Sequence, residues 1–356
     1  MSKYIRSEIL SMSGYVPGEQ PALQKNVVKL NTNENPYRAS EKVYDAIRSV
    51  LESGLSRYPD PFGEAFRVAV SRRYGVEPSM VLCGNGSDDI LTILTRTFVG
   101  GGELLRLPYP TYILYRSLAE IQGARSEFIY FNDDWSLPDE FYSSKSDLRL
   151  VFLPNPNSPS GTIIPKDRIL EIAEQLCCPL VIDEAYVDFA GCSCMDLVGS
   201  CERIIVTRTF SKAYSLAGLR FGYLVAAANL VEQMLKVKDS YNCDAISIAA
   251  ATAAISDESW LAENRKKIIA TRTRLTEKMR AIGFKVPDSS ANFTWNTHSE
   301  IDVRLVYDYL KSRGVLVRYM SYPSWGDGLR ISVGTDDQID QCLELISQYI
   351  SHGDAV

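Results

Sequence analysis

The sequence is poor in histidine and has no long apolar run. Only His298 and His352 occur among its 356 residues, which argues against Ser-His-Asp and Cys-His catalysis. The longest stretch of small apolar residues, 246–255, is shorter than the roughly 18 residues that a membrane span needs. The N-terminus lacks the apolar segment of a signal peptide. We therefore expect no membrane association and a cytoplasmic location.

The sequence also lacks a basic cluster and a metal-binding cysteine pattern. Its net charge is −6, which disfavours nucleic acid as a partner, although local arginines can still bind an anionic substrate. The eight cysteines contain no paired CxxC motif, and the "CSC" at 192–194 has no histidine nearby. We therefore expect reduced thiols and no metal site.

The composition and the strand pattern indicate a large α/β protein. Hydrophobic residues make up 46% of the chain and charged residues 23%, which is enough for a sizeable core. We expect an N-terminal arm (1–27), a large α/β domain (28–240) and a small α+β domain (241–356) that packs with the arm. Uniformly apolar strands alternate with helices in the large domain, a pattern typical of a mostly parallel sheet covered on both faces.

Polar motifs follow the ends of four predicted strands. "GNGSDD" follows Cys83, "NPNSPSG" follows Leu153, Asp183 ends a third strand, and Lys212 follows a fourth. Open parallel sheets bind ligands beyond the carboxyl ends of their strands. These motifs therefore predict one shared site at that edge of the sheet.

The "GNGSDD" motif and Asp183 suggest a phosphate and a positively charged ring. Gly86, Ser87 and Asp88 form a turn that opens a helix, where free N–H groups favour a phosphate; a simple helix cap is the alternative. Asp183 is costly to bury without a partner. It either caps the next turn or faces a protonated pyridine nitrogen, and Tyr186 could then contact an oxygen on the same ring.

Lys212 has two interpretations, a solvated surface lysine or a nucleophile. A partly desolvated lysine near positive groups has a lowered pKa and can form a Schiff base with an aldehyde. Thr209, Ser211 and Arg220 lie where they could hold a phosphate beside it. A lysine, a buried acid, a phosphate site and a stacking aromatic ring together fit pyridoxal 5′-phosphate (PLP).

Seven motifs then identify a family resemblance. The string "TFSKAYSLAGLRFG" contains Lys212. Six motifs precede it, namely "LNTNENP", "RYPD", "GNGSDD", "PYPTY", "NPNSPSG" and "VIDEAY", and "LRISVGT" follows it, so that the resemblance covers residues 14–335. This set resembles the fold-type I PLP-dependent aminotransferases and is most similar to the histidinol-phosphate aminotransferase group. The resemblance implies a large, mostly parallel sheet domain flanked by helices, a smaller α+β domain and a homodimer with shared active sites.

The resemblance also implies roles for individual residues. Lys212 would form the Schiff base and move a proton between Cα and C4′, while Asp183 would pair with the pyridinium nitrogen and Tyr186 would contact the ring 3-oxygen. Tyr112 would stack on the ring, unless it is a core aromatic. Tyr58 would reach the cofactor phosphate from the partner subunit. The other phosphate contacts would be Gly86, Ser87, Asp88, Thr209, Ser211 and Arg220.

One position departs from the family pattern. The family commonly has asparagine before the proline of "NPTG", where it contacts the ring 3-oxygen, and this chain has Ser158 there. Either Asn157 turns in to replace that contact, or Tyr186 and Ser158 provide it.

The expected substrate contacts are Arg330, Arg318, Tyr15 and Asn33. Two arginines and a phenol suit a phosphate dianion better than a single carboxylate. Alternatively, Arg318 is a surface arginine and Tyr15 a packed arm residue. The resemblance implies ping-pong transamination of histidinol phosphate with 2-oxoglutarate, giving imidazole-acetol phosphate and glutamate. In histidine biosynthesis the reaction would run toward histidinol phosphate.

Four alternatives remain at this point. An aromatic amino-acid aminotransferase or a threonine-phosphate decarboxylase would use the same scaffold and keep Lys212, Asp183 and Arg220. A non-catalytic PLP-binding or ligand-sensing protein is disfavoured because the whole catalytic set is present. A nucleotide-binding protein is weaker still, because "GNGSDD" lacks both the GxGxxG and the GK[ST] spacing.

Overall fold

The computed structural model describes residues 3–21 and 27–352. Part of the expected N-terminal arm, residues 1–2 and 22–26, lies outside the described residues. Within the described residues, every helix is too short or too polar to span a bilayer. The same residues hold no group of three or more His, Cys, Asp or Glu side chains placed to bind a metal ion.

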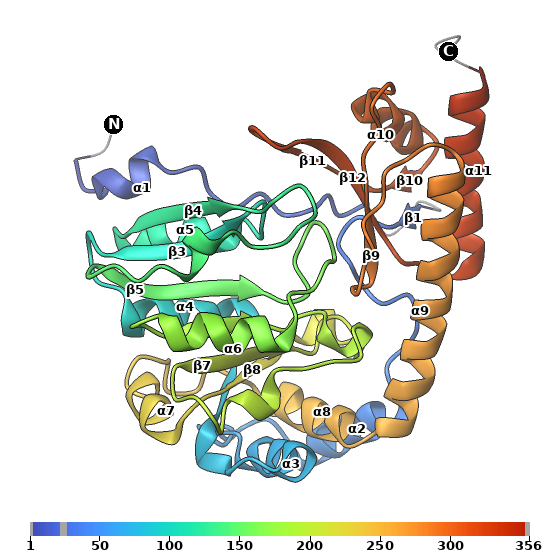
Figure 1. Ribbon diagram of the computed structural model, residues 1–356. Coiled ribbons are helices and arrows are strands. Elements are labelled where there is room, and N and C mark those ends of the chain that lie inside the picture. The colour runs from blue at the N-terminus through green and yellow to red at the C-terminus, as the bar shows by residue number, and fades with distance from the viewer. Residues whose placement is uncertain (1–2, 22–26, 353–356) are drawn as a thin grey trace.

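A seven-stranded sheet forms the centre of the molecule (Figure 1). Its strand order is β2-β8-β7-β6-β5-β3-β4, and β8 runs opposite to the other strands of this sheet. The predicted fold class, a mostly parallel α/β sheet, is confirmed. The strands are β2 (Val81–Gly84), β3 (Leu104–Tyr109), β4 (Arg125–Tyr130), β5 (Leu148–Pro154), β6 (Leu180–Asp183), β7 (Ile204–Thr209) and β8 (Gly222–Val225).

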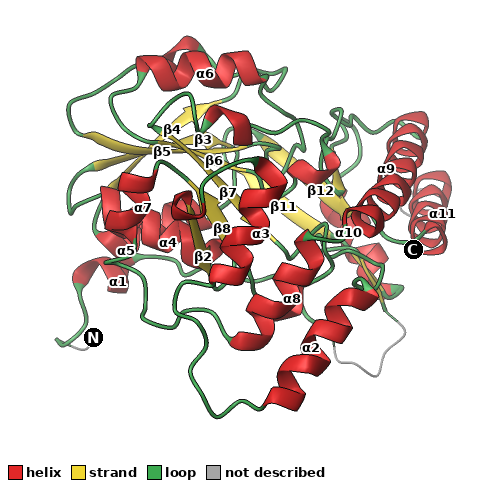
Figure 2. Cartoon of the chain, turned by 90° about the horizontal axis from the view of Figure 1, so that it is seen from below, coloured by secondary structure: helices red, strands yellow, loops and turns green. Residues whose placement is uncertain are grey.

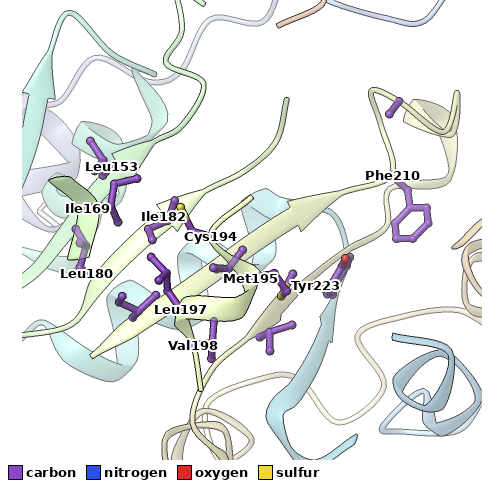
Figure 3. Packing of buried hydrophobic residues seen from close by; sticks show 14 of the residues in the cluster. Leu153, Ile169, Leu180, Ile182, Cys194, Met195, Leu197, Val198, Phe210 and Tyr223 are labelled. Carbon is purple, nitrogen blue, oxygen red and sulfur yellow. The ribbon is translucent and has the colours of Figure 1, made fainter. Parts of the chain in front are cut away.

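Helices cover both faces of this sheet because its strands are apolar on both sides. In β6, Leu180 and Ile182 face one hydrophobic cluster while Val181 faces the other, as the two-residue period of a strand requires. Residues of α3 (Glu64–Tyr74), α6 (Lys166–Gln175) and α8 (Ala245–Ile255) join the first cluster. Residues of α4 (Ser87–Phe98), α5 (Leu114–Gln122) and α7 (Ala228–Met234) join the second. Figure 3 shows part of the first cluster, with Ile169 of α6 beside the strands.

Two of the described helices around the large sheet begin at a side-chain cap, Ser40 for α2 (Glu41–Ser53) and Asp244 for α8 (Ala245–Ile255). The Ser40 side chain accepts a hydrogen bond from Lys42 N and caps α2, as N-cap serines do. Figure 2 shows α2, α3 and α8 packed together on one side. The helices are α1 (Ser7–Ser11), α2 (Glu41–Ser53), α3 (Glu64–Tyr74), α4 (Ser87–Phe98), α5 (Leu114–Gln122), α6 (Lys166–Gln175), α7 (Ala228–Met234) and α8 (Ala245–Ile255). Short 3-10 turns are η1 (Pro78–Met80), η2 (Asp139–Tyr142), η3 (Val187–Phe189), η4 (Met195–Leu197) and η5 (Ala217–Leu219).

The C-terminal part contains a smaller antiparallel sheet of order β11-β12-β9. A two-residue parallel pairing joins β1 to β10, so the chain just after the arm already contacts the C-terminal part. The division at residues 27 and 240 stays a prediction. The elements are β1 (Val28–Lys29), α9 (Glu258–Ala281), β9 (Phe293–Asn296), α10 (Val303–Ser312), β10 (Val315–Leu316), β11 (Arg318–Tyr322), β12 (Gly326–Ser332) and α11 (Asp336–His352).

Candidate active site

A pocket of about 180 Å³ lies beyond the carboxyl ends of β5, β6 and β7. The register places Pro154, Asp183 and Thr207 side by side at this edge, and Lys212 follows β7 by three residues. The β11–β12 hairpin supplies part of the opposite wall. The pocket brings together most of the predicted site residues: Tyr15, Asn33, Ser87, Asp88, Tyr112, Asp183, Tyr186, Thr209, Ser211, Lys212, Arg220, Arg318 and Arg330.

Three predicted residues do not line this pocket. Gly86 lies directly behind its wall, at the start of α4. The Asn157 side chain is buried and donates to Pro110 O (3.3 Å) and Ser160 Oγ (3.0 Å), whereas Ser158 lines the pocket. Tyr58 is 80% exposed and lies away from the pocket of its own chain. The contacts expected of Asn157 and Tyr58 with the cofactor therefore stay predictions.

Lys212 is held in the pocket by the loop that follows β1. Its Nζ donates a hydrogen bond to Thr32 O at 3.1 Å and lies 5.7 Å from the centre of the Tyr186 ring. Burial, helped by the positive charge of Arg330, lowers the pKa of Lys212 from 10.5 to about 8. The amine is therefore neutral in a useful fraction of molecules near neutral pH, as a nucleophile or a base requires.

Asp183 ends β6 and is almost fully buried. Its Oδ1 accepts hydrogen bonds from Ala185 N (3.1 Å) and Thr207 Oγ1 (3.3 Å), and its Oδ2 accepts one from the Tyr115 hydroxyl (2.6 Å). Burial raises the pKa of Asp183, and these three donors oppose that rise. A cationic group in the pocket would complete the stabilisation of the carboxylate.

Tyr115 lines the same pocket, although no motif in the sequence points to it. Tyr115 lies on the apolar face of α5, where an aromatic residue is indistinguishable from core packing in the sequence. It was missed because only the three-dimensional structure brings α5 to the end of β6.

A positively charged cradle lies at the N-terminus of α4. Arg220 Nη1 donates to Ser211 Oγ (3.2 Å), and Arg220 Nη2 donates to Asp88 Oδ2 (3.2 Å). Gly86, the N-cap of α4, has a positive φ of 84°, and a Cβ there would lie 2.6 Å from Arg220 Nη2. Among the described residues no side chain caps α4, so its first N–H groups are available for an anion.

A second cluster of positive charge faces the first across the pocket. Arg318 and Arg330 are direct partners across β11 and β12, a pairing that repels unless an anion lies between or beside the charges. Arg330 Nη1 donates to Ser158 Oγ at 3.0 Å, and Arg330 Nη2 donates to Asn31 O at 3.2 Å. Within the described residues, Arg330 Nε is buried without a hydrogen-bond partner.

Arg318 and Tyr15 connect this cluster to the N-terminal arm. Arg318 Nη2 donates to Val16 O at 3.1 Å. The Tyr15 ring meets Tyr112 edge-on, with ring centres 6.1 Å apart, and Tyr15 remains 42% exposed. The arm therefore covers the outer part of the pocket with the Tyr15 phenol and with two carbonyls that accept from Arg318, Val16 O and Pro17 O.

Asn33 lies in the pocket, but its amide is already engaged. Its Nδ2 donates to the Tyr186 hydroxyl at 3.0 Å, and its Oδ1 accepts from Ser332 Oγ at 2.9 Å. Its φ of 57° is unusual for a residue other than glycine. In this arrangement Asn33 positions Tyr186, and its predicted contact with substrate stays a prediction.

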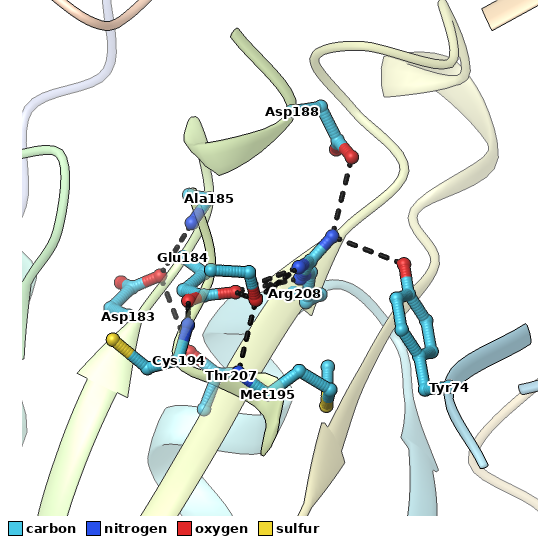
Figure 4. A network of polar contacts seen from close by, with 10 residues as sticks. Tyr74, Asp183, Glu184, Ala185, Asp188, Cys194, Met195, Thr207 and Arg208 are labelled. Carbon is cyan, nitrogen blue, oxygen red and sulfur yellow. Dashed lines mark hydrogen bonds and ion pairs between the residues drawn. The ribbon is translucent and has the colours of Figure 1, made fainter. Parts of the chain in front are cut away.

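A buried ionic network supports the site from behind (Figure 4). Arg208 of β7 donates through Nε to Glu184 Oε2 (2.9 Å) and through Nη1 to Asp188 Oδ1 and the Tyr74 hydroxyl (both 3.2 Å). Glu184 adjoins Asp183, and Arg208 adjoins Thr207. The network therefore fixes the ends of β6 and β7. The first carries Asp183, and the second leads into the loop that carries Lys212.

These groups fit PLP in each of its parts. The uncapped start of α4 with Arg220 suits the phosphate, Asp183 suits a protonated ring nitrogen, and Lys212 suits the aldehyde. Tyr112 and Tyr186 border the space between them. The cluster of Arg318 and Arg330 is left over by this assignment and provides a separate anion site.

Comparisons with known proteins agree with this chemistry. A sequence profile of the family described as aminotransferase class I and II matches residues 25–346. A histidinol-phosphate aminotransferase from Rhodopirellula baltica is 56% identical over 344 residues, covering 96% of this chain and 95% of the relative. Histidinol-phosphate aminotransferase 1 from Nostoc is 43% identical, covering 99% and 100%.

A solved structure shows the same architecture. The crystal structure of a histidinol-phosphate aminotransferase from Sinorhizobium meliloti, in complex with pyridoxal-5′-phosphate, superposes with a TM-score of 0.86 at 25% identity. The match covers 98% of this chain and 99% of that one.

Proposed function

The chain belongs to the class I and II aminotransferases, and we propose that it transfers the amino group of histidinol phosphate to 2-oxoglutarate. The products are imidazole-acetol phosphate and glutamate, and in histidine biosynthesis the reaction runs toward histidinol phosphate. The cofactor is PLP. The observation that supports this amino donor is the cross-strand pair of Arg318 and Arg330, which provides a dianion site apart from the cofactor cradle.

PLP, when bound, supplies an aldehyde that bonds to amines and a ring that accepts electrons from the Cα bonds. Lys212 would hold the cofactor through Nζ, and its neutral Nζ would take the proton from the substrate Cα. The pKa of about 8 leaves Lys212 able to accept and return that proton near neutral pH. Asp183 holds the positive charge at the ring nitrogen.

The remaining residues bind and orient. Arg220, Ser211 and Thr209, with the start of α4, hold the cofactor phosphate, while Tyr112 and Tyr186 border its ring. Arg330 and Arg318 bind the substrate phosphate, and Tyr15 closes the pocket over it. Water is kept from the reacting atoms by the arm and by the β11–β12 hairpin.

We also propose a homodimer in the cytoplasm. Tyr58 is 80% exposed and stacks on Tyr241 with ring centres 4.5 Å apart. The nearby side chains of Leu51, Leu55 and Phe62 are about half exposed, which a second copy would cover. Tyr58 would then complete the phosphate site of the partner. All eight cysteines are free thiols, which suits a reducing compartment.

The test is the visible absorbance of the PLP-loaded protein, mixed with one amine at a time and no oxo-acid. Histidinol phosphate should remove the visible band at low concentration, whereas phenylalanine and threonine phosphate should not. If only phenylalanine removes the band, the protein is an aromatic amino-acid aminotransferase. If threonine phosphate releases CO₂, the decarboxylase is correct. Either result would leave the family and the cofactor unchanged.

A further inference from the structure

Among the described residues, the hydroxyl of Tyr115 has one hydrogen-bond partner, which is Asp183. The donor–acceptor distance is 2.6 Å, and Tyr115 has no exposed surface. Its ring stacks on Phe152 of β5, with centres 4.9 Å apart and planes 21° apart, and meets the Tyr112 ring edge-on. Because these ring contacts fix the side chain, the position of the hydroxyl oxygen does not depend on the hydrogen bond itself.

This hydrogen bond acts on the carboxylate oxygen that the backbone does not hold. Ala185 N and Thr207 Oγ1 both donate to Oδ1, which leaves Tyr115 as the donor to Oδ2 among the described residues. In the part of the chain that the structure describes, the titratable groups that interact with Asp183 include Tyr115 from α5, Asp88 from α4 and Tyr186. The negative charge of Asp88 opposes ionisation of Asp183, whereas the hydrogen bond from Tyr115 to Oδ2 favours it.

We propose that Tyr115 is a positioning residue, which keeps Asp183 ionised and aimed at the cofactor ring nitrogen. A strong O–H···O⁻ bond stabilises the carboxylate form more than the acid form. The ring nitrogen therefore keeps its proton and the ring keeps its positive charge. This inference depends on the proposed cofactor contacts, and not on which amine is the substrate.

The proposal predicts a specific spectroscopic change in Tyr115→Phe. Without the hydroxyl, the proton shared by Asp183 and the ring nitrogen moves toward Asp183, and the ring becomes less positive. The nitrogen that links Lys212 to the cofactor then loses a nearby positive charge, so the pKa of that linkage rises. A hydrogen bond to a charged group corresponds to roughly one to two pKa units, so the pKa of the linkage should rise by about two units at most.

The experiment is a pH titration of the visible band of the PLP-loaded protein, with no substrate present. The matched control is Tyr223→Phe, which removes another buried tyrosine hydroxyl, on β8, outside the pocket. We expect the band of Tyr115→Phe to titrate at higher pH than wild type, and that of Tyr223→Phe to titrate as wild type. In turnover, Tyr115→Phe should lower kcat about tenfold and leave KM within about twofold, because the hydroxyl binds no substrate.

An unchanged band titration in a folded Tyr115→Phe protein would overturn the proposal, as would equal shifts in both variants. If Tyr115→Phe does not fold, site-specific 3-fluorotyrosine at position 115 keeps the ring and the hydroxyl but makes a stronger donor. The band should then titrate at lower pH than wild type, and no shift would again refute the proposal. A failure of the substrate assignment leaves these titrations unaffected, so the two hypotheses fail separately.

Discussion

Lys212 Nζ donates its hydrogen bond to the carbonyl oxygen of Thr32, at 3.1 Å across the pocket. The two residues are 180 positions apart in the chain, and the contact joins the loop after β7 to the loop after β1. A carbonyl oxygen accepts a hydrogen bond from a charged or a neutral amine, although the bond from the charged amine is the stronger. Thr32 can therefore hold Lys212 in place without fixing its protonation state, which burial and Arg330 control.

Replacing Lys212 by alanine should abolish transamination. The side chain serves both as the covalent attachment and as the proton carrier, and losing both should lower kcat by about 10⁴-fold or more. Steady-state assays with histidinol phosphate and 2-oxoglutarate measure this. Lys236→Ala, at an exposed lysine on the surface, is the control and should keep wild-type rates. A Lys212→Ala protein with its function intact would support a non-catalytic binding or sensing role.

The reaction of the cofactor-free protein with PLP should depend on pH through Lys212. Only the neutral amine attacks the aldehyde, so the rate should rise with pH and reach half its maximum near pH 8, following the lowered pKa of about 8. Stopped-flow absorbance measures this rate. Arg330→Gln removes a positive charge that lowers this pKa, so its midpoint should move up. Glu34→Gln removes a negative charge and should move the midpoint down. A midpoint near 10.5 in the wild type would mean that Lys212 is solvated.

Arg330 and Arg318 should control the affinity for the substrate phosphate. Loss of a charge-assisted hydrogen bond costs roughly 1.5–3 kcal/mol, so Arg330→Gln or Arg318→Gln should raise KM for histidinol phosphate by roughly 10- to 100-fold. The control is Arg304→Gln, at an exposed arginine of α10. For unphosphorylated histidinol, the KM of these variants should differ less from that of the wild type. Equal losses with both amines would contradict the assignment of these arginines to the phosphate.

Tyr58 should act on the site of the partner subunit. We expect Tyr58→Ala and Lys212→Ala homodimers both to be impaired, and mixed dimers to recover activity. In a mixed dimer, one site receives both defects and the other receives neither, provided that Tyr58 crosses the interface. Unfolding and refolding the two variants together, followed by a rate assay, tests this. Without recovery in verified mixed dimers, Tyr58 would act within its own chain or not at all.

The buried network around Arg208 should contribute strongly to stability. Arg208→Leu leaves Glu184 and Asp188 buried without their cation, and breaking such a pair costs about 3–5 kcal/mol. Denaturant unfolding measures this loss. The comparison is Lys267→Ala, which removes the exposed pair with Glu263 and should cost about 0.5 kcal/mol at most. Similar losses in the free energy of unfolding for both variants would show that the buried network stabilises the fold no more than the exposed pair does.

The sequence by itself determined the sheet and the edge that carries the site. Apolar strands ending in Asp183 and continuing to Lys212 place both residues beyond the carboxyl ends of parallel strands, because that arrangement is local to each strand and its turn. The turn at Gly86 could also be predicted from the sequence, because a glycine turn before a helix is a local feature. In the structure this glycine allows the close approach of Arg220.

The tertiary structure alone decided which side chains act together across the fold. The bond from Tyr115 to Asp183, the pairing of Arg318 with Arg330 and the use of the Asn33 amide by Tyr186 all join distant segments. A residue pattern of period two or 3.6 reports which face of an element is buried, and it does not report what that face meets. Those contacts depend on the packing of whole elements, and they set the protonation and the aim of the groups that the sequence had already brought to one edge.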